Sequence, residues 1–188
     1  MIKINKILLS PHNDDETLFA AYIILREKPL VVIATDGYAQ MERSHKEITP
    51  ELRKNETLCA MKILGAEVEF FGIRDTLINH ESLKRKLATF NPEIVYAPYP
   101  NSVHEQHNLV GNMAYELYGN RVKFYATYTK QEVYNIETLA PKGDIEIKPT
   151  KEEMELKNRA LDCYKSQIKL CNLHFLAVRN KSEYLCLK

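Results

Sequence analysis

Four residues near the start of the chain carry side chains that can bind a metal ion or move a proton: His12, Asp14, Asp15 and Glu16. They follow the apolar residues 7–9, which predict a buried strand whose carboxyl end is the usual place for a ligand site in an open α/β sheet. Imidazole and carboxylate groups are common ligands of a divalent metal such as zinc. We therefore interpret His12 and Asp15 as metal ligands and Asp14, between them, as a base.

The same acids could instead cap the helix that is expected to follow, because acidic residues are favoured at a helix N-terminus. That explanation accounts for one acid, and Ser10 or Asn13 could fill the same role. Consecutive acids and a histidine directly after a buried strand are costly without a cation. The cluster therefore favours a metal site over a helix cap.

A second pair of candidate residues, His104 and His107, follows another predicted buried strand, residues 93–97. Because they are three positions apart, both rings can face one pocket if the turn is helical. One ring would bind the metal and the other would approach the substrate. Two histidines and one carboxylate leave an open position on zinc, which is typical of a catalytic site. With water in that position, Asp14 as base and the second histidine as donor, the set predicts amide hydrolysis.

The other histidines lack this setting. We interpret His80 and His174 as structural or surface residues. His45 remains a candidate only because its polar segment, residues 39–50, is expected to form a mobile loop over the site.

The elements that must position these residues alternate along the chain. Apolar runs predict strands over residues 3–9, 30–34, 68–72, 93–97 and 122–128, with an edge strand at 183–187. Helical spacing and caps predict helices over residues 15–27, 50–65, 82–90 and 109–118 and from Thr150 to about 168, while 133–147 is irregular. The alternation predicts an α/β fold with a mainly parallel sheet and right-handed crossovers.

Composition limits the function classes. The length of 188 residues suits one domain, residues 1–188, and the 26 basic and 25 acidic side chains nearly cancel. We therefore expect a small-molecule substrate and no nucleic acid partner. No segment approaches the about 20 apolar residues of a membrane span, and no secretory leader precedes the first strand. A nucleotide-binding module is disfavoured, because no Gly-x-Gly-x-x-Gly follows that strand.

Four scattered cysteines without a Cys-x-x-Cys pair complete this picture. We interpret them as reduced thiols of a soluble, cytoplasmic protein. They are Cys59, Cys163, Cys171 and Cys186.

Several motifs, in the same order, resemble the PIG-L/LmbE-type metal-dependent N-deacetylases. Residues 10–16 resemble the family's A/S-H-P-D-D-E motif, and His104-x-x-His107 resembles its H-P-D-H motif. Residues 35–37 resemble its T-D-G turn. Two helices resemble further family motifs through Arg53, Glu56, Ala60, Leu64 and Gly65 and through Lys157, Ala160, Leu161, Tyr164, Ser166 and Gln167.

The resemblance implies a Rossmann-like three-layer sandwich with helices on both faces. It implies a zinc ion held by His12, Asp15 and His107, although another divalent transition metal would also fit. Asp14 would be the general base and His104 the electrophilic and acid partner. The implied reaction removes an acetyl group from an N-acetylglucosamine-type substrate, such as a sugar conjugate.

Arg53 and Asp36 are the candidate substrate-binding residues, and each has an alternative. Arg53 could instead pair with Glu56 on a helix surface. Asp36 could instead fix its own turn.

The sequence also departs from the family motifs. Asn13 replaces a Pro, and Gln106 replaces the acid that could orient the first histidine of H-P-D-H. Glu105 or a residue elsewhere would then have to support His104, or the pH optimum would differ. A same-fold hydrolase of a non-sugar amide and a degenerate sugar-binding relative remain alternatives. The sequence is also compatible with an oligomer.

Overall fold

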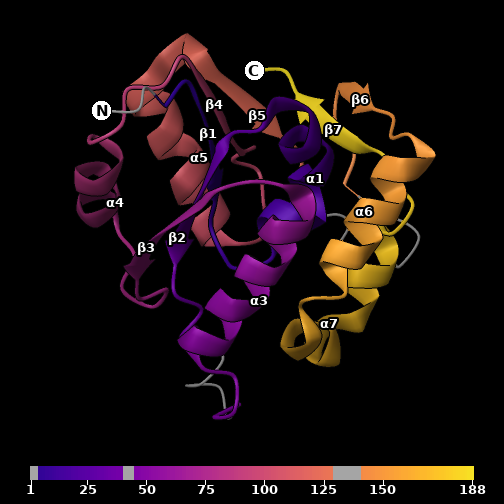
Figure 1. Ribbon diagram of the computed structural model, residues 1–188. Coiled ribbons are helices and arrows are strands. Elements are labelled where there is room, and N and C mark those ends of the chain that lie inside the picture. The colour runs from indigo at the N-terminus through magenta and orange to yellow at the C-terminus, as the bar shows by residue number, and fades with distance from the viewer. Residues whose placement is uncertain (1–3, 40–44, 129–140) are drawn as a thin grey trace.

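The computed structural model describes residues 4–39, 45–128 and 141–188, which form a seven-stranded sheet with helices on both faces (Figure 1). The strand order is β3-β2-β1-β4-β5-β7-β6. Strands β1 to β5 are parallel, and β7 is antiparallel to β5 and β6. The bounds are β1 Lys6–Ser10, β2 Leu30–Thr35, β3 Val68–Ile73, β4 Ile94–Pro98, β5 Val122–Tyr125, β6 Ile145–Ile147 and β7 Glu183–Cys186. The predicted Rossmann-like α/β class is confirmed.

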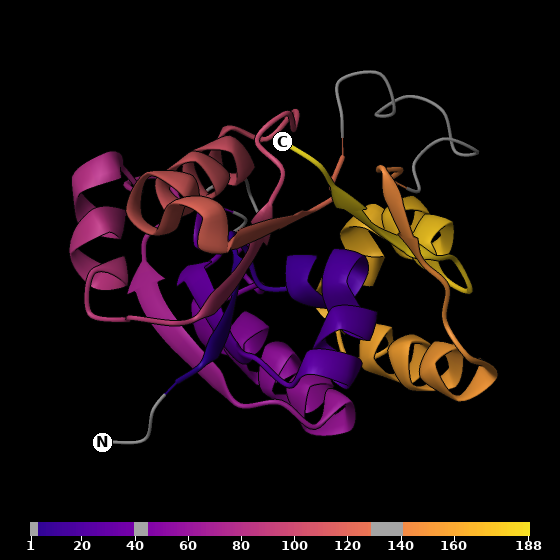
Figure 2. The same cartoon turned by 90° about the horizontal axis from the view of Figure 1, so that it is seen from above.

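The helices pack in two layers, with α4 and α5 on one face of the sheet and α1, α3, α6 and α7 on the other (Figure 2). Their bounds are α1 Asp15–Glu27, α3 Pro50–Leu64, α4 His80–Leu87, α5 Glu105–Tyr118, α6 Lys151–Leu161 and α7 Lys165–Val178, with a 3-10 turn η1 at Gly119–Arg121. Alternate residues of β1 serve the two layers: Leu8 joins one apolar core, and Ile7 and Leu9 join the other. Burial of both faces is why this strand is continuously apolar.

The first half of the chain follows its local signals. Helix α1 has the predicted bounds, 15–27. Helix α3 begins after Thr49, whose side chain accepts a hydrogen bond from the backbone N–H of Leu52, and Pro50 occupies the first turn. The helix ends at Gly65, which has a φ of 67°.

The second half of the chain departs from several predictions. The single helix predicted from Thr150 to about 168 is wrong, because α6 ends at Leu161 and α7 begins at Lys165. Between them, Cys163 is bonded to another helix and the Tyr164 hydroxyl donates to Glu16, so tertiary contacts outweigh the helical spacing.

The predicted edge strand at 183–187 forms as β7 but is internal, because β6 pairs with its outer side. Strand β6 lies in the segment that the sequence predicts to be irregular, residues 133–147, of which 133–140 fall outside the described residues. The Thr150 capping box is confirmed.

A buried ion pair stabilises a kink in α1. Ala20 has non-helical angles, φ −140° and ψ 19°, within the helix. The two groups that a regular helix would join at this turn, Leu18 O and Tyr22 N, are bonded to Lys157 Nζ and to Glu183 Oε2, each at 2.9 Å. Lys157 and Glu183 pair at 2.7 Å and are almost fully buried. The pair thereby satisfies the backbone of the kink.

We expect Lys157→Met to lower the free energy of unfolding by about 3–5 kcal/mol, because Glu183 would remain buried without its cation. Urea unfolding measures this change. The control is Lys151→Met on the same helix, since Lys151 is exposed and a surface substitution stays within about 0.5 kcal/mol. Equal stability of the two variants would contradict the role assigned to the ion pair.

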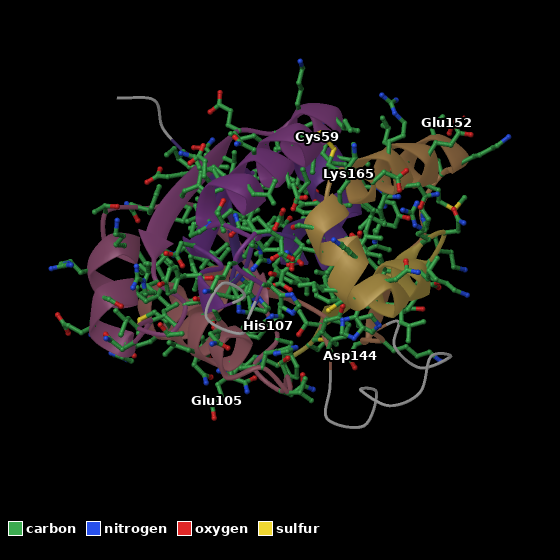
Figure 3. The ribbon with its side chains drawn as sticks, turned by 90° about the horizontal axis from the view of Figure 1, so that it is seen from below. Cys59, Glu105, His107, Asp144, Glu152 and Lys165 are labelled. Carbon is green, nitrogen blue, oxygen red and sulfur yellow. A yellow bond between two sulfur atoms is a disulfide. The ribbon has the colours of Figure 1, made fainter. Side chains whose placement is uncertain are left out.

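The prediction of four reduced thiols is wrong for two cysteines. Cys59 in α3 and Cys163 between α6 and α7 form a disulfide, with Cα atoms 5.9 Å apart (Figure 3). The two residues are 104 positions apart, so only the packing of α3 against α6 brings them together. The expectation of a cytoplasmic location rested partly on reduced cysteines and loses that support. Within the described ranges, no helix has the length and apolar character needed to cross a bilayer.

Candidate metal centre

The site forms where the carboxyl ends of two neighbouring strands meet. Strands β1 and β4 pair in parallel, with Leu8 opposite Tyr96, so the loops that follow them lie together. The first loop carries His12 and leads into α1. The second leads into α5, which begins at Glu105, earlier than the predicted 109, and places His107 in its first turn. His12 and His107 thus converge, with ring centroids 5.3 Å apart.

His12, Asp15 and His107 each offer one ligand atom, and these three atoms lie within 4.8 Å of one another. Asp15 Oδ2 is 2.9 Å from His12 Nδ1 and 3.0 Å from His107 Nε2. In a tetrahedral zinc site with bonds of about 2.0–2.1 Å, ligand atoms are roughly 3.3 Å apart. The three atoms therefore need only small shifts to enclose a metal ion.

The buried ring of His107 supports this fit. The residue is 1% exposed, and neither of its ring nitrogens has an aligned hydrogen bond to a described residue, despite the short approach of Nε2 to Asp15. A buried polar atom without a partner costs about 1–3 kcal/mol. An imidazole beside a carboxylate and a second imidazole forms the kind of donor set that binds a divalent metal.

The pKa values of the neighbouring acids Asp14 and Asp15 are shifted in opposite directions. Burial raises the pKa of Asp15, but the adjacent His107 and His12 rings outweigh it and hold this pKa well below its usual value. Burial raises the pKa of Asp14 well above its usual value, the Arg53 guanidinium opposes the rise, and the charges of Asp15 and Glu16 add to it. The surroundings thus favour the ionised form of Asp15, whereas they raise the affinity of Asp14 for a proton.

Asp14 occupies the N-cap position of α1, but its side chain does not cap the helix. Its side chain makes no capping hydrogen bond to a described residue, and the Glu16 N–H donates instead to Ser10 Oγ at 3.1 Å. The backbone of Asp14 has a φ of 146°, which is rare for a residue other than glycine. Such a conformation persists when its surroundings enforce it, and here Arg53 Nη2 approaches Asp14 Oδ2 to 3.5 Å. The helix-cap alternative therefore fails for this residue.

Glu16 stabilises the loop between β1 and α1 through hydrogen bonds. Its fully buried carboxylate accepts hydrogen bonds from Ser10 Oγ at 2.9 Å, from Asp14 N at 3.1 Å and from the Tyr164 hydroxyl. Burial raises the pKa of Glu16, and these donors oppose the rise. Sequence reasoning assigned no role to Tyr164 beyond the motif resemblance. Its contact with Glu16 joins segments 148 positions apart.

His104 stands beside the three-residue cluster and is not part of it. Its ring centroid is 5.2 Å from that of His107 and 6.2 Å from that of His12. His104 is exposed to solvent on one side, but desolvation by the protein around it, together with the neighbouring His107, lowers the pKa of His104 to about 4. The neutral ring retains one N–H that it can donate.

The family motif has an acid where this chain has Gln106, and Glu105 or a residue elsewhere is expected to support His104 in its place. Glu105 is exposed and points away from the cavity, whereas His107 points inward (Figure 3). Gln106 lines the cavity. Support of His104 by Glu105 is therefore excluded by the direction of its side chain.

Arg53 lies inside the protein, so the alternative of a surface pair with Glu56 is wrong. Arg53 is 4% exposed, its Nη2 donates to the carbonyl of Asn13 at 2.8 Å, and it lines the cavity. Glu56 instead accepts hydrogen bonds from Ser166, at 2.8 Å from N and 2.6 Å from Oγ. The position of Arg53 also explains why the turn at residues 35–37 ends in glycine, because a Cβ on Gly37 would lie 2.5 Å from Arg53 Nη1.

Asp36 fixes its own turn, which was the alternative to a site role. Its Oδ1 accepts hydrogen bonds from Tyr38 N at 3.0 Å and from Asp75 N at 3.4 Å. Of the two acids, Asp75 lines the cavity. Asp75 in turn accepts a hydrogen bond from Ala39 N at 2.8 Å.

The remaining histidines divide between cavity and surface. His174 lies on the separate helix α7, lines the cavity and packs its ring against that of Tyr128, a contact that fits the structural interpretation. His80 is exposed and pairs with Glu116 at 2.8 Å, which confirms the surface prediction. His45 approaches Glu47 at 3.9 Å and is not among the described residues that line the cavity. Residues 40–44 of its predicted loop fall outside the described residues.

The cavity that contains these groups has a volume of about 170 Å³. Helix α7 contributes Gln167, Cys171, His174 and Phe175, and Tyr128 follows β5. Pockets that bury drug-sized ligands measure about 300–1,000 Å³. The cavity between the described walls is therefore smaller than a pocket that buries a whole drug-sized ligand.

Comparison with known proteins agrees with this geometry. Residues 7–118 match the family model described as PIG-L, GlcNAc-PI de-N-acetylase, which confirms the resemblance seen in the motifs. No curated protein matches the chain.

Three solved structures have the same fold. The hydratase GalB from Pseudomonas putida, which acts on 4-carboxy-2-hydroxymuconate, is 20% identical, with a TM-score of 0.68 over 97% of this chain and 95% of that one. The conserved protein TT1542 from Thermus thermophilus is 19% identical, with a TM-score of 0.69 over 97% and 94%. The zinc-inhibited form of teicoplanin deacetylase Orf2 is 16% identical, with a TM-score of 0.68 over 89% and 86%.

Proposed function

Because the chain belongs to the PIG-L family, whose model describes a GlcNAc-PI de-N-acetylase, we propose that it is a metal-dependent N-deacetylase. The observation that carries the proposal is the convergence of His12, Asp15 and His107 in the cavity that also holds Asp14 and His104. The proposed substrate is a small N-acetylated molecule of the N-acetylglucosamine type, such as a sugar conjugate. The deacetylases of teicoplanin and of the A40926 pseudoaglycone share the fold and support this choice. We further propose that residues 1–188 act as one deacetylase domain.

We propose that His12, Asp15 and His107 hold one divalent ion, with zinc as the expected metal. When bound, the ion supplies Lewis acidity, which polarises a carbonyl group and makes water a stronger acid. Asp14 stays outside the ligand set, since it is not part of the three-residue cluster; its carboxylate instead approaches Arg53 at 3.5 Å.

In the proposed hydrolysis, the proton transfers are carried out by two side chains that line the cavity, Asp14 and His104. Asp14 accepts a proton from water as the water oxygen attacks the acyl carbon. His104 donates a hydrogen bond to the acyl oxygen while the carbon is tetrahedral. The carbon–nitrogen bond then breaks: His104 passes to the nitrogen the proton that Asp14 took from water, so both side chains return to their starting protonation states. The products are acetic acid, which ionises to acetate, and a free amine. Arg53 supports the ionised form of Asp14.

Acetate release tests the proposal. The purified chain, stripped with chelator and reloaded with zinc, should release acetate and one equivalent of amine from N-acetylglucosamine or its glycosides. Release of acetate from non-sugar amides alone would favour the alternative of a hydrolase with the same fold that acts on a non-sugar amide. Binding of these sugars without turnover would favour a degenerate binder and contradict the proposal. Hydration of an unsaturated acid, the reaction class of GalB, is the control for a fold that hosts more than one chemistry.

We expect His104→Ala to keep its metal and to lower kcat by about 10²–10³-fold, because one donor to the acyl oxygen is lost. His104 borders the cavity but is not part of the three-residue cluster. Metal analysis and steady-state kinetics of the same preparation check both halves of the prediction. Unchanged turnover would show that another group protonates the amine.

A further inference from the structure

Tyr128, which lines the cavity, carries a second potential donor that has no partner among the described residues. The hydroxyl of Tyr128 is buried and makes no hydrogen bond to any described residue. The whole residue is 4% exposed. Buried hydroxyl groups are normally paired, so an unpaired one at a cavity wall points to a partner that arrives with the ligand.

Neighbouring rings fix the direction of this side chain. Tyr128 packs edge-on against Phe19, with ring centroids 4.6 Å apart, and against His174 at 4.7 Å. Its ring centroid lies 6.1 Å from that of His104, which lines the same cavity. A ring held on two sides presents its hydroxyl in one direction, so a donor here is preorganised.

The proposed reaction has a use for such a donor. His104 must stabilise the acyl oxygen and later deliver a proton to the nitrogen, and one N–H cannot do both at the same moment. A hydroxyl that keeps its proton can hold the oxygen while His104 turns to the nitrogen. Burial raises the pKa of Tyr128 well above its usual value, and the charges of Asp14 and Asp15 raise it further. Tyr128 therefore donates a hydrogen bond and does not act as an acid.

We propose that Tyr128 donates a hydrogen bond to the acyl oxygen of the substrate and stabilises the tetrahedral transition state. The proposal rests on the deacetylase function proposed above. It adds a catalytic residue that no sequence motif indicated, since Tyr128 lies in a strand-like segment beyond both histidine motifs.

The test compares two matched variants of the zinc-loaded protein. Tyr128→Phe keeps the ring and removes only the unpaired hydroxyl. Tyr22→Phe is the control, because the Tyr22 hydroxyl is also buried and unpaired among the described residues, but it lies in the core outside the cavity. Neither variant loses a hydrogen bond within the described structure, so both should retain or raise the thermal midpoint. We expect kcat to fall about 10²-fold in Tyr128→Phe and to change less than twofold in Tyr22→Phe, with KM little changed in both.

Calorimetric titration gives a second readout that does not need turnover. The probe is a phosphonamidate analogue of the best N-acetylated substrate, whose tetrahedral oxygens mimic the transition state. Its Kd should weaken in Tyr128→Phe by about the same factor as kcat/KM falls, with no change in Tyr22→Phe. If the wild type is active and Tyr128→Phe matches it in kcat, or differs only in KM, the inference is wrong and the deacetylase function stands. If the wild type releases no acetate, the proposed function fails and this inference fails with it.

Discussion

Replacement of Asp14 by Asn is expected to lower kcat by about 10²–10⁴-fold while one metal ion per chain remains bound. Asn preserves the size of the side chain and removes the oxygen that accepts the proton. Asp14 adjoins Asp15 in sequence but is not part of the His12, Asp15 and His107 cluster. Its carboxylate approaches Arg53, which would keep the side chain in place. Activity and metal binding should therefore separate at this one residue.

Metal analysis by mass spectrometry and acetate release, measured on the same preparation, check this separation. Glu105→Gln is the matched control, because it removes one acidic charge near the site from a side chain that points to solvent (Figure 3). The control should keep both activity and metal. Loss of metal together with activity in Asp14→Asn would show that Asp14 is a ligand and would contradict the division of roles.

Replacement of His107 by Ala is expected to abolish stoichiometric metal binding and, with it, detectable turnover. His107 is the only proposed ligand from the second loop, so its removal leaves only His12 and Asp15 from the first. Two ligands do not hold zinc in the three-ligand arrangement of catalytic sites. The ring nitrogens of His107 have no aligned hydrogen bond to a described residue, so the substitution breaks none.

Equilibrium dialysis against zinc, followed by metal analysis, measures the loss. His80→Ala is the control, since His80 is a surface histidine that pairs with Glu116. Circular dichroism of both variants establishes that the fold is retained. Full occupancy in folded His107→Ala would remove this residue from the ligand set.

The part of the site that sequence could predict is the part that strand order determines. His12 follows β1 and His107 follows β4, and adjacent parallel strands must deliver their carboxyl ends to one edge. The apolar runs and helix caps that locate these strands and helices are local signals. The fold class and the meeting of the two loops therefore follow from the sequence pattern.

The features that sequence reasoning missed all depend on contacts between distant segments. Helix α7 places His174 in the cavity wall, the Cys59–Cys163 bond joins α3 to the α6–α7 junction, and Tyr128 reaches the cavity from beyond β5. No spacing rule relates these positions to the motifs. The helical periodicity predicted one long helix from Thr150 to about 168, but the chain forms two helices because the disulfide holds the junction between them.

One departure from the family motif acquires a physical explanation. Asn13 takes the position of a proline, and its side chain is 1% exposed and donates to Thr57 Oγ1 at 3.2 Å. Its carbonyl accepts a hydrogen bond from Arg53. Asn13 thus ties the metal loop to α3 through hydrogen bonds, where a proline would restrict the loop through its ring.

The central claim is that two loops distant in sequence bind one cation between them. Anomalous diffraction at the zinc edge, from crystals grown with one equivalent of zinc, tests it directly. We expect one strong peak about 2.0–2.2 Å from the ligand atoms of His12, Asp15 and His107, with Asp14 outside bonding distance. The absence of a peak between these residues, or a fully occupied zinc bound elsewhere, would contradict the account.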